Sequence, residues 1–268
     1  MAVVQSKLVS EEKYVRKLFD AVKRGDVEDI KFYIGTKNVD PNTRDENGDT
    51  PIIVAARKGY TYVIDALISL GSDPGKKDKQ GRDALHNYLD HNYTLSIYLP
   101  ELYSTGIQVT DNEGNSYLHS ATKKYNINAI DELIKAGSVI DAVNHDDETA
   151  LHIAVKNLSD DTDEFHKENF PSKSHKCIRM LIRRGSRLSA RDNDGNTPVH
   201  LIAEKGCSIS LEYVMEVLDE DCNVFSTTNK AGKTPLDVAK NDKIASRIKE
   251  VIDDQGVASK KRKIVKRS

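Results

Sequence analysis

A repeat of about 33 residues runs along this chain and limits its possible folds more than any other feature of the sequence. Most copies place Asp or Asn three residues before Gly, and three copies continue with Thr-Pro. Gly48, Gly81 and Gly114 lie 33 residues apart, and a further 33 residues reach Asp147, where glycine is replaced. The next two glycines of the series follow after 48 and 37 residues, so two copies contain insertions. A period of this length predicts a row of similar units that bury their apolar faces against one another.

Each copy carries the local signals of a tight loop followed by two helices. Glycine can adopt the positive φ that a hairpin tip requires. Thr50, Thr197 and Thr234 are predicted helix N-caps, and the proline after each suits the first helical position, where its missing N–H costs nothing. In the second copy the pattern predicts helices over residues 52–57 and 63–70, each followed by a glycine that ends it.

The motif D-x-x-G-x-T-P-L-H-x-A at this period resembles the ankyrin-repeat family, and the resemblance covers roughly residues 12–253. It implies an all-α repeat solenoid, an ankyrin-repeat array of helix-turn-helix units joined by β-hairpin loops. The fifth repeat holds an insertion over residues 159–175, which we expect to be a flexible loop. About seven repeats are expected, near residues 12–43, 44–76, 77–109, 110–142, 143–190, 191–227 and 228–253.

The two ends of the chain differ from the repeats between them. Ser10 precedes a helix with apolar residues at helical spacing, and Gly25 closes that helix. No hairpin motif comes before it, so this first pair of helices is interpreted as a capping repeat. Residues 254–268 have no core-forming period, and we expect them to be a disordered basic tail.

The net charge of −2 hides an asymmetry between this tail and the rest of the chain. Residues 254–268 hold six basic residues and one acid, so residues 1–253 carry 34 basic and 41 acidic residues, or −7. The basic run looks like a monopartite nuclear localisation signal that an import receptor reads. Non-specific attraction to phosphate or to a membrane surface is the alternative. The residues of this signal are Lys260, Lys261, Arg262, Lys263, Lys266 and Arg267.

Several classes of protein are excluded by residue usage. Three cysteines without C-x-x-C spacing offer neither a disulfide framework nor a four-ligand zinc site, which favours a reducing intracellular setting. No run approaches the roughly eighteen apolar residues of a membrane helix, and no signal-peptide core follows the start. Motifs for a serine nucleophile, a phosphate-binding loop or a zinc protease are absent. We expect a soluble monomer that is not an enzyme and binds no cofactor, metal or small-molecule substrate.

Histidine recurs at one position of the repeat, as His86, His119, His152 and His200. Neighbouring copies of such an array lie about 10 Å apart, too far to share one metal ion at about 2 Å from each nitrogen. In the ankyrin family this imidazole hydrogen-bonds to the backbone of the neighbouring hairpin, and we predict that structural role here. Ile53 and Asp237 replace it in the second and seventh repeats, so those copies must close the turn differently.

The third repeat departs most from the pattern. Pro100 falls within a predicted helix over residues 95–103, where it would kink or restart the helix. Four tyrosines at intervals of five residues fill the core or provide an aromatic anchor for a partner, and both interpretations stay open. They are Tyr88, Tyr93, Tyr98 and Tyr103.

The resemblance implies a concave face, formed by hairpin tips and first helices, that binds a protein partner. The charges at its contact positions are mixed, which favours a protein over nucleic acid, since nucleic acid would require a continuous basic stripe. Phe165 and Phe170 in the insertion are an alternative binding finger. The family's contact positions correspond here to Glu46, Asn47, Asp49, Arg57, Lys58, Lys79, Gln80, Arg82, Asp90, His91, Asn112, Glu113, Asn115, Lys123, Lys124, His145, Asp146, Glu148, Asn193, Asp194, Asn196, Glu204 and Lys205.

These features favour a non-enzymatic protein–protein interaction scaffold, an adaptor or inhibitor found in nucleus and cytoplasm. Two alternatives stay open. A microbial effector delivered into a host cell would use an ankyrin array in the same way, and would act in the host nucleus. A nucleic-acid-associated regulatory factor would use the basic tail as its anchor, and its affinity for DNA would fall steeply with salt.

Overall fold

The computed structural model describes residues 2–91, 106–158, 172–218 and 223–265, with side chains described from residue 11 to residue 254 of these ranges. Over these residues the chain is helical, and its one bridge between extended segments joins Thr110 and Ser116. The helical content confirms the all-α prediction, although the loops are closed by turns and not by regular strands. The chain forms two compact units, Met1–Ser138 and Val139–Ser268.

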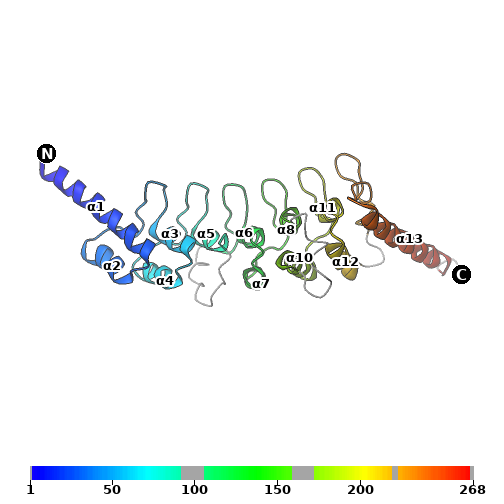
Figure 1. Ribbon diagram of the computed structural model, residues 1–268, viewed down its shortest axis with the longest axis horizontal. Helices are drawn as coiled ribbons and strands as arrows, with labels where there is room; N and C mark the ends of the chain where they lie inside the picture. The colour runs from blue at the N-terminus through cyan, green and yellow to red at the C-terminus, as the bar shows by residue number, and fades with distance from the viewer. Residues whose placement is uncertain (1, 92–105, 159–171, 219–222, 266–268) are drawn as a thin grey trace. The chain divides into compact units, whose positions relative to one another are not determined.

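The first unit alternates helices with long loops, and the loops before α3, α5 and α6 project on the same side of it (Figure 1). The first helices of successive repeats contact one another, α1 with α3, α3 with α5, and α5 with α6. The second helices pack against them, α4 on α3 and α7 on α6. The elements are α1 (Ala2–Arg24), α2 (Val27–Lys31), the π-helix η1 (Phe32–Thr36), α3 (Pro51–Lys58), α4 (Thr61–Ser69), α5 (Ala84–Leu89), α6 (Tyr117–Lys123) and α7 (Ile127–Lys135).

The second unit repeats this arrangement. Helix α8 packs against α10 and α11, and α12 packs against α10 and α11. The loops before α8 and α11 again project together from one side (Figure 1). Its elements are α8 (Ala150–Lys156), α10 (Lys173–Arg183), α11 (Pro198–Lys205), α12 (Ser208–Val217) and α13 (Asp242–Val265).

Several helix ends lie where the turn and cap residues predict them. Thr50 is the N-cap of α3, and Gly59 ends that helix in the left-handed conformation with φ of 68°. Thr197 caps α11 and accepts a hydrogen bond from the His200 N–H. Asp147, which stands where other repeats have glycine, has φ of 57°. The backbone conformation of the hairpin tip is therefore kept although the residue changes.

Gly81 shows why the tips need glycine. Its φ is +75°, and a Cβ atom there would lie 2.8 Å from the backbone nitrogen of Asn112 in the next tip. Real Cβ atoms do not approach backbone so closely, and side chains rarely adopt this φ. Glycine at this position therefore allows neighbouring tips to touch.

Of the four apolar positions of α4 that the pattern predicts to face the neighbouring repeat, three are buried and the fourth, Ile68, is half-buried. Val63, Ile64 and Leu67 of α4 have no exposed surface, and Leu18 of α1 has none. Tyr88 is 2% exposed and belongs to the core. The other three tyrosines of the third repeat, and Pro100, lie outside the described residues.

The N-terminal helix is longer than its sequence signals predict. Helix α1 begins at Ala2, so the prediction that the helix starts after Ser10 is wrong. Gly25, with φ of 74°, ends the helix as predicted. The residues before Ser10 include no glycine or proline, so none of them breaks the helix. The later turns of the same helix are stabilised by packing in the core.

Helix α13 also differs from expectation, because it continues to Val265 where the sequence predicts a disordered tail from residue 254. Its last inward-facing contacts are made earlier, by Ile244 at 1% and Ile248 at 0% exposure. Lys, Arg and Ala beyond them are good helix formers, and basic side chains near a helix C-terminus interact favourably with its dipole.

Two further segments depart from the pattern. In the seventh repeat the residues after Thr234 form a turn and not the predicted helix. The Asp237 carboxylate closes this turn by accepting from the Thr234 N–H at 2.8 Å and the Thr234 hydroxyl at 2.7 Å, in place of histidine. In the fifth repeat the predicted loop ends early, because Ser172 caps α10 and His175 is buried within it.

Candidate functional site

The loops between repeats are shaped by a carboxylate or amide side chain at their base. Asp78 Oδ1 accepts hydrogen bonds from the backbone N–H groups of Gln80 and Arg82, both at 2.9 Å. The Asp78 N–H donates to the Arg82 carbonyl at 2.9 Å, which closes the loop. Asn144 accepts the equivalent two bonds in the second unit, at 3.0 and 2.9 Å. The residues enclosed by these bonds form the hairpin tip.

Neighbouring tips are joined through their backbones. In the first unit the Asn112 N–H donates to the Gln80 carbonyl at 2.9 Å, and the Asn112 side-chain amide donates to the Lys79 carbonyl at 3.1 Å. In the second unit the Asn193 N–H donates to the Asp146 carbonyl at 2.9 Å. Each unit therefore holds a row of tips with a fixed main chain.

Most predicted partner-binding residues are exposed on these rows or beside them. Their side chains carry both signs of charge. The exposed residues at the tips are Glu46, Asn47, Lys79, Gln80, Asn112, Glu113, His145, Asp146, Asn193 and Asp194. The exposed residues at the ends of the first helices are Lys58, His91, Lys123, Lys124 and Glu204.

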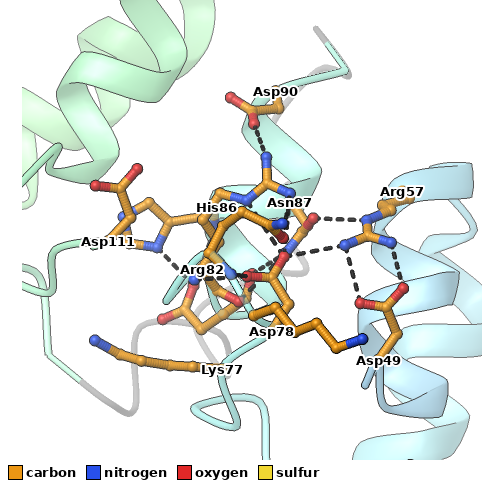
Figure 2. Close-up of polar contacts among 12 residues, drawn as sticks. Asp49, Arg57, Lys77, Asp78, Arg82, His86, Asn87, Asp90 and Asp111 are labelled. Carbon is orange, nitrogen blue, oxygen red and sulfur yellow. Dashed lines mark hydrogen bonds and ion pairs between the residues drawn. The ribbon is translucent and has the colours of Figure 1, made fainter. Parts of the chain in front are cut away.

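Four predicted contact residues of the first unit are instead paired inside it (Figure 2). The Arg57 guanidinium donates two hydrogen bonds to the Asp49 carboxylate and one, at 3.0 Å, to Asp78. Arg82 donates to Asp78 at 3.1 Å and to Asp90 at 2.9 Å. We call these five residues the first charge ladder. The charged groups of the predicted contacts Asp49, Arg57, Arg82 and Asp90 are therefore paired within this unit, with one another or with Asp78.

Asp78 is the centre of the first charge ladder. Its side chain is 1% exposed and also accepts from the Asn87 side-chain amide at 3.1 Å. Burial works to raise the pKa of Asp78, but bonds from the Arg82 backbone and from Asn87, with the charge of Arg82, outweigh burial and hold the pKa below its ordinary value. This carboxylate is therefore ionised and fully engaged with the chain's own groups.

The second unit has an equivalent set, the second charge ladder, made of Glu148, Lys156 and Asp192. The Lys156 ammonium lies 2.6 Å from Glu148 Oε1 and 3.1 Å from Asp192 Oδ2. Burial works to raise the pKa of Glu148, but bonds from Lys156 and Asn144 lower it overall. Glu148 is thus a further predicted contact residue whose charge is used internally. Asn115, Asn196 and Lys205 are half-buried, and Lys205 donates to the Leu158 carbonyl at 3.2 Å.

The ladder residues Asp78, Lys156 and Asp192 are not among the contacts predicted from the sequence, and neither is Asn87, which donates to Asp78. The available signal was the spacing of charges, because opposite charges stand eight residues apart at 49 and 57, 82 and 90, and 148 and 156. That spacing joins a loop to the end of the helix that follows it. The third member comes from the next repeat, so only the repeat register reveals it.

The recurring histidines have the structural role predicted for them. His152 Nδ1 accepts from the Thr149 N–H at 3.1 Å, and His152 Nε2 lies 3.1 Å from the Asn196 carbonyl. His200 makes the same pair of contacts, the second with the Lys233 carbonyl at 3.0 Å. Burial lowers the pKa of both histidines, although the bonds to these carbonyls oppose it. Among the residues described, no three His, Cys, Asp or Glu side chains are grouped to hold a metal ion.

His86 is the exception among them, because its cap is a carboxylate. Asp83 Oδ1 accepts from the His86 N–H at 3.0 Å and lies 3.0 Å from His86 Nδ1. The Tyr117 hydroxyl donates to the other Asp83 oxygen. Burial works to raise the pKa of Asp83, but the bonds and charge of His86, and then the Tyr117 bond, lower it overall.

A groove of about 610 Å³ lies between α1 and the loop before α3 in the first unit. Its walls combine apolar and charged side chains of both signs, so it suits a segment of mixed polarity. The residues that line it include the predicted contacts Glu46 and Asn47 at the tip. The groove is also lined by Val15, Arg16, Phe19, Lys23, Arg44 and Asp45.

Two sets of predicted site residues are not placed by the structure. Phe165 and Phe170 lie outside the described residues, as do Lys266 and Arg267. The backbone of Lys260, Lys261, Arg262 and Lys263 belongs to α13, and their side chains are not described.

Comparison with known proteins agrees with the repeat geometry. A family model described as ankyrin repeats in three copies matches residues 18–96. The ankyrin repeat domain of Bcl-3, described as a unique member of the IkappaB protein family, superimposes with a TM-score of 0.69 at 20% identity. That match covers 86% of this chain and 96% of the Bcl-3 domain. This chain has the ankyrin-repeat fold. The ankyrin domain of human ASB11 has the same fold, with a TM-score of 0.68 at 17% identity.

Among sequence relatives, the NF-kappa-B inhibitor delta of Mus musculus is 25% identical over 201 residues, which is 73% of this chain. The putative ankyrin repeat protein L371 of Acanthamoeba polyphaga mimivirus is 23% identical over 218 residues, or 78% of this chain. The matches span 52% and 26% of those two proteins. This ankyrin-repeat chain therefore corresponds to only part of each relative.

The ankyrin-repeat fold is a non-enzymatic interaction fold. A protein named as an enzyme is also among the sequence relatives, since the palmitoyltransferase ZDHHC13 of Pongo abelii is 27% identical over 163 residues, 26% of its length. Within the described part of this chain, no helix is both long enough and apolar enough to cross a membrane.

Proposed function

We propose that this chain is an adaptor or inhibitor that covers a surface of a protein partner with its hairpin tips. Ankyrin repeats form protein–protein interaction scaffolds, and the row of exposed tip side chains on a hydrogen-bonded main chain carries the proposal. A fixed main chain reduces the entropy lost on binding. The mixed charges of the tips suit a protein surface better than a polyanion.

The charge ladders reduce the set of side chains that are proposed to contact the partner. In the first unit the exposed tip residues remain as proposed contacts with the partner. The first charge ladder holds the loops that carry them in place. The same division holds in the second unit, where Lys156 ties Glu148 to the next repeat. The face that the ankyrin family presents as concave is thus proposed to bind through its tips. The relative named as an NF-kappa-B inhibitor supports an occluding role.

Affinity purification from cells, followed by mass spectrometry, identifies the partner, and tip variants then test the surface. Lys79→Glu combined with Gln80→Glu is expected to weaken partner binding at least about tenfold, or 1.4 kcal/mol. The free energy of unfolding should change by no more than about 0.5 kcal/mol, because both side chains are exposed. Binding is measured by calorimetry with the purified partner.

Two further variants make this test decisive. Lys176→Glu, an exposed charge reversal on α10, should leave binding unchanged. Deletion of residues 160–170 should also have little effect, and it ends before Ser172 so that α10 keeps its cap. If the tip variant binds fully and the deletion abolishes binding, the finger with Phe165 and Phe170 is the recognition element and the tips are not.

The basic C-terminus is proposed to direct nuclear import. Deletion of residues 260–267 should abolish nuclear accumulation of a large fluorescent fusion, because an import receptor reads a basic peptide of this kind. Folding should be unaffected, since among the side chains of α13 that are described, those to residue 254, Ile248 is the last that is buried. Microscopy of the fusion and its circular dichroism spectrum measure the two effects. Unchanged nuclear enrichment of the truncated fusion would contradict import.

A further inference from the structure

We propose that Tyr14, Phe32 and Tyr33 form an aromatic site for a methylated lysine side chain of a partner protein. These three residues, the aromatic cluster, lie where α1 meets η1 in the first repeat. The proposal concerns a site separate from the hairpin tips, and it does not depend on them.

The rings of the aromatic cluster form one continuous surface. The Tyr14 and Tyr33 ring centroids are 6.3 Å apart, and those of Phe32 and Tyr33 are 5.4 Å apart with planes at 74°. The Tyr33 residue is 9% exposed, and Phe32 is 43% exposed. The Tyr14 and Phe32 rings therefore both contact the buried Tyr33 ring, and the Phe32 ring is open to solvent.

A cation already occupies this surface. The Lys37 ammonium lies 5.1 Å from the Phe32 ring centroid and 5.5 Å from the Tyr14 centroid, within the range of cation–π attraction. Within the described residues Lys37 forms no ion pair, whereas nearby Lys31 pairs with Glu28 at 3.1 Å. The rings alone hold the Lys37 ammonium, which shows that a lysine side chain fits there.

The π-helix creates this arrangement. In an α-helix, residues five apart point about 140° away from each other. In η1 the Lys37 N–H donates to the Phe32 carbonyl at 3.1 Å, the five-residue step of a π-turn. The wider turn brings residues five apart closer to the same side, and Lys37 reaches the Phe32 ring. A π-turn is uncommon and often marks a functional site.

The chemistry favours a methylated ammonium over Lys37 itself. An unmodified ammonium is compact and strongly hydrated, so it loses water when it leaves solvent for the rings. Methylation keeps the positive charge but replaces the N–H donors with apolar methyl groups. Aromatic rings accordingly recognise quaternary ammonium groups, as in methyl-lysine cages. Lys37 then acts as a tethered competitor that holds the site until a better cation displaces it.

The test uses a short peptide with one trimethyllysine, titrated onto the full chain and followed by the proton resonance of its N-methyl groups. Ring currents should shift that resonance upfield as the site fills. Lys37→Ala should tighten binding about threefold, since the tethered competitor is gone. Phe32→Leu should weaken it about tenfold, because it keeps an apolar side chain and removes the ring.

Controls separate this site from general aromatic contact. Tyr62→Ala removes a ring that is 54% exposed and over which no cation of the described residues lies, and it should leave peptide binding unchanged. The same peptide with unmodified lysine should bind at least about tenfold more weakly. Equal affinity for both peptides, or for free choline and the trimethyllysine peptide, would overturn the assignment. Loss of binding in both Lys37→Ala and Phe32→Leu would overturn the competitor role of Lys37.

Discussion

Replacing Asp78 with alanine is expected to lower the free energy of unfolding by about 3 kcal/mol. The substitution leaves Arg57, Arg82 and Asn87 without the carboxylate that they share, and it removes two backbone hydrogen bonds of the loop. Breaking a buried pair costs more than the pair contributes, because the partners remain desolvated. Urea denaturation followed by circular dichroism measures the change, since the chain has no tryptophan.

Asp45→Ala is the matched control for this prediction. Asp45 has the same place in the preceding loop and accepts the same two backbone bonds, from Asn47 at 2.9 Å and Asp49 at 3.0 Å. No arginine bond to its side chain is found among the described residues, so its replacement should cost only about 1 kcal/mol. If Asp78→Ala and Asp45→Ala lower the free energy of unfolding equally, the first charge ladder contributes no stability beyond that of the loop hydrogen bonds.

Acid provides a second measure of the Asp78 contribution. The pKa of Asp78 is lower in the folded chain than in the unfolded chain, where it is about 3.9. The stability from its ionised form is therefore complete above the unfolded pKa and is lost as pH falls through the folded pKa. The difference between the parent and Asp78→Ala should be constant near neutral pH and shrink below about pH 4.

Tyr117→Ala is expected to lower the free energy of unfolding by about 4 kcal/mol. The Tyr117 side chain is fully buried, and its ring centroid lies 4.4 Å from that of His86. Its removal leaves a cavity between the third and fourth repeats. Tyr117→Phe keeps the ring and removes only the hydroxyl that bonds Asp83, so it should cost about 1–2 kcal/mol.

The same denaturation measurement tests both substitutions at Tyr117. Tyr62→Ala, at a half-exposed ring, should cost about 1 kcal/mol or less. If Tyr117→Phe has the stability of the parent, the Asp83 carboxylate is satisfied by His86 alone. If Tyr117→Ala lowers the free energy of unfolding no more than Tyr62→Ala does, the cavity prediction is wrong, because the neighbouring repeats then close the space that the ring leaves.

Features set by residues close together in sequence could be predicted. The positive φ of the tip glycines, the N-cap threonines and the histidine contacts recur at a fixed place in several copies, so the copies that share them support one another. Departures arose where a local signal was overridden. Ser10 is a good N-cap residue, yet nothing upstream stops the helix, and α1 begins at Ala2. Thr234 and the proline after it signal a helix start, yet Asp237 binds Thr234 and a turn forms.

The sequence by itself determined the repeat, its period, the helix pairs and the loops, because these depend on side chains that act within a few residues of their own backbone. Only the tertiary structure decided which polar residues are exposed and which pair with the chain's own groups in the same or the next repeat. Asp49 and Glu46 lie in the same loop and are both acidic, but Asp49 is buried against Arg57 and Glu46 is exposed. Asp49 pairs with Arg57 eight residues further on, and Arg57 is itself bonded to Asn87 and Asp78 of the next repeat, 30 and 21 residues away. Stacked repeats bring these groups within hydrogen-bond distance, which local sequence does not specify.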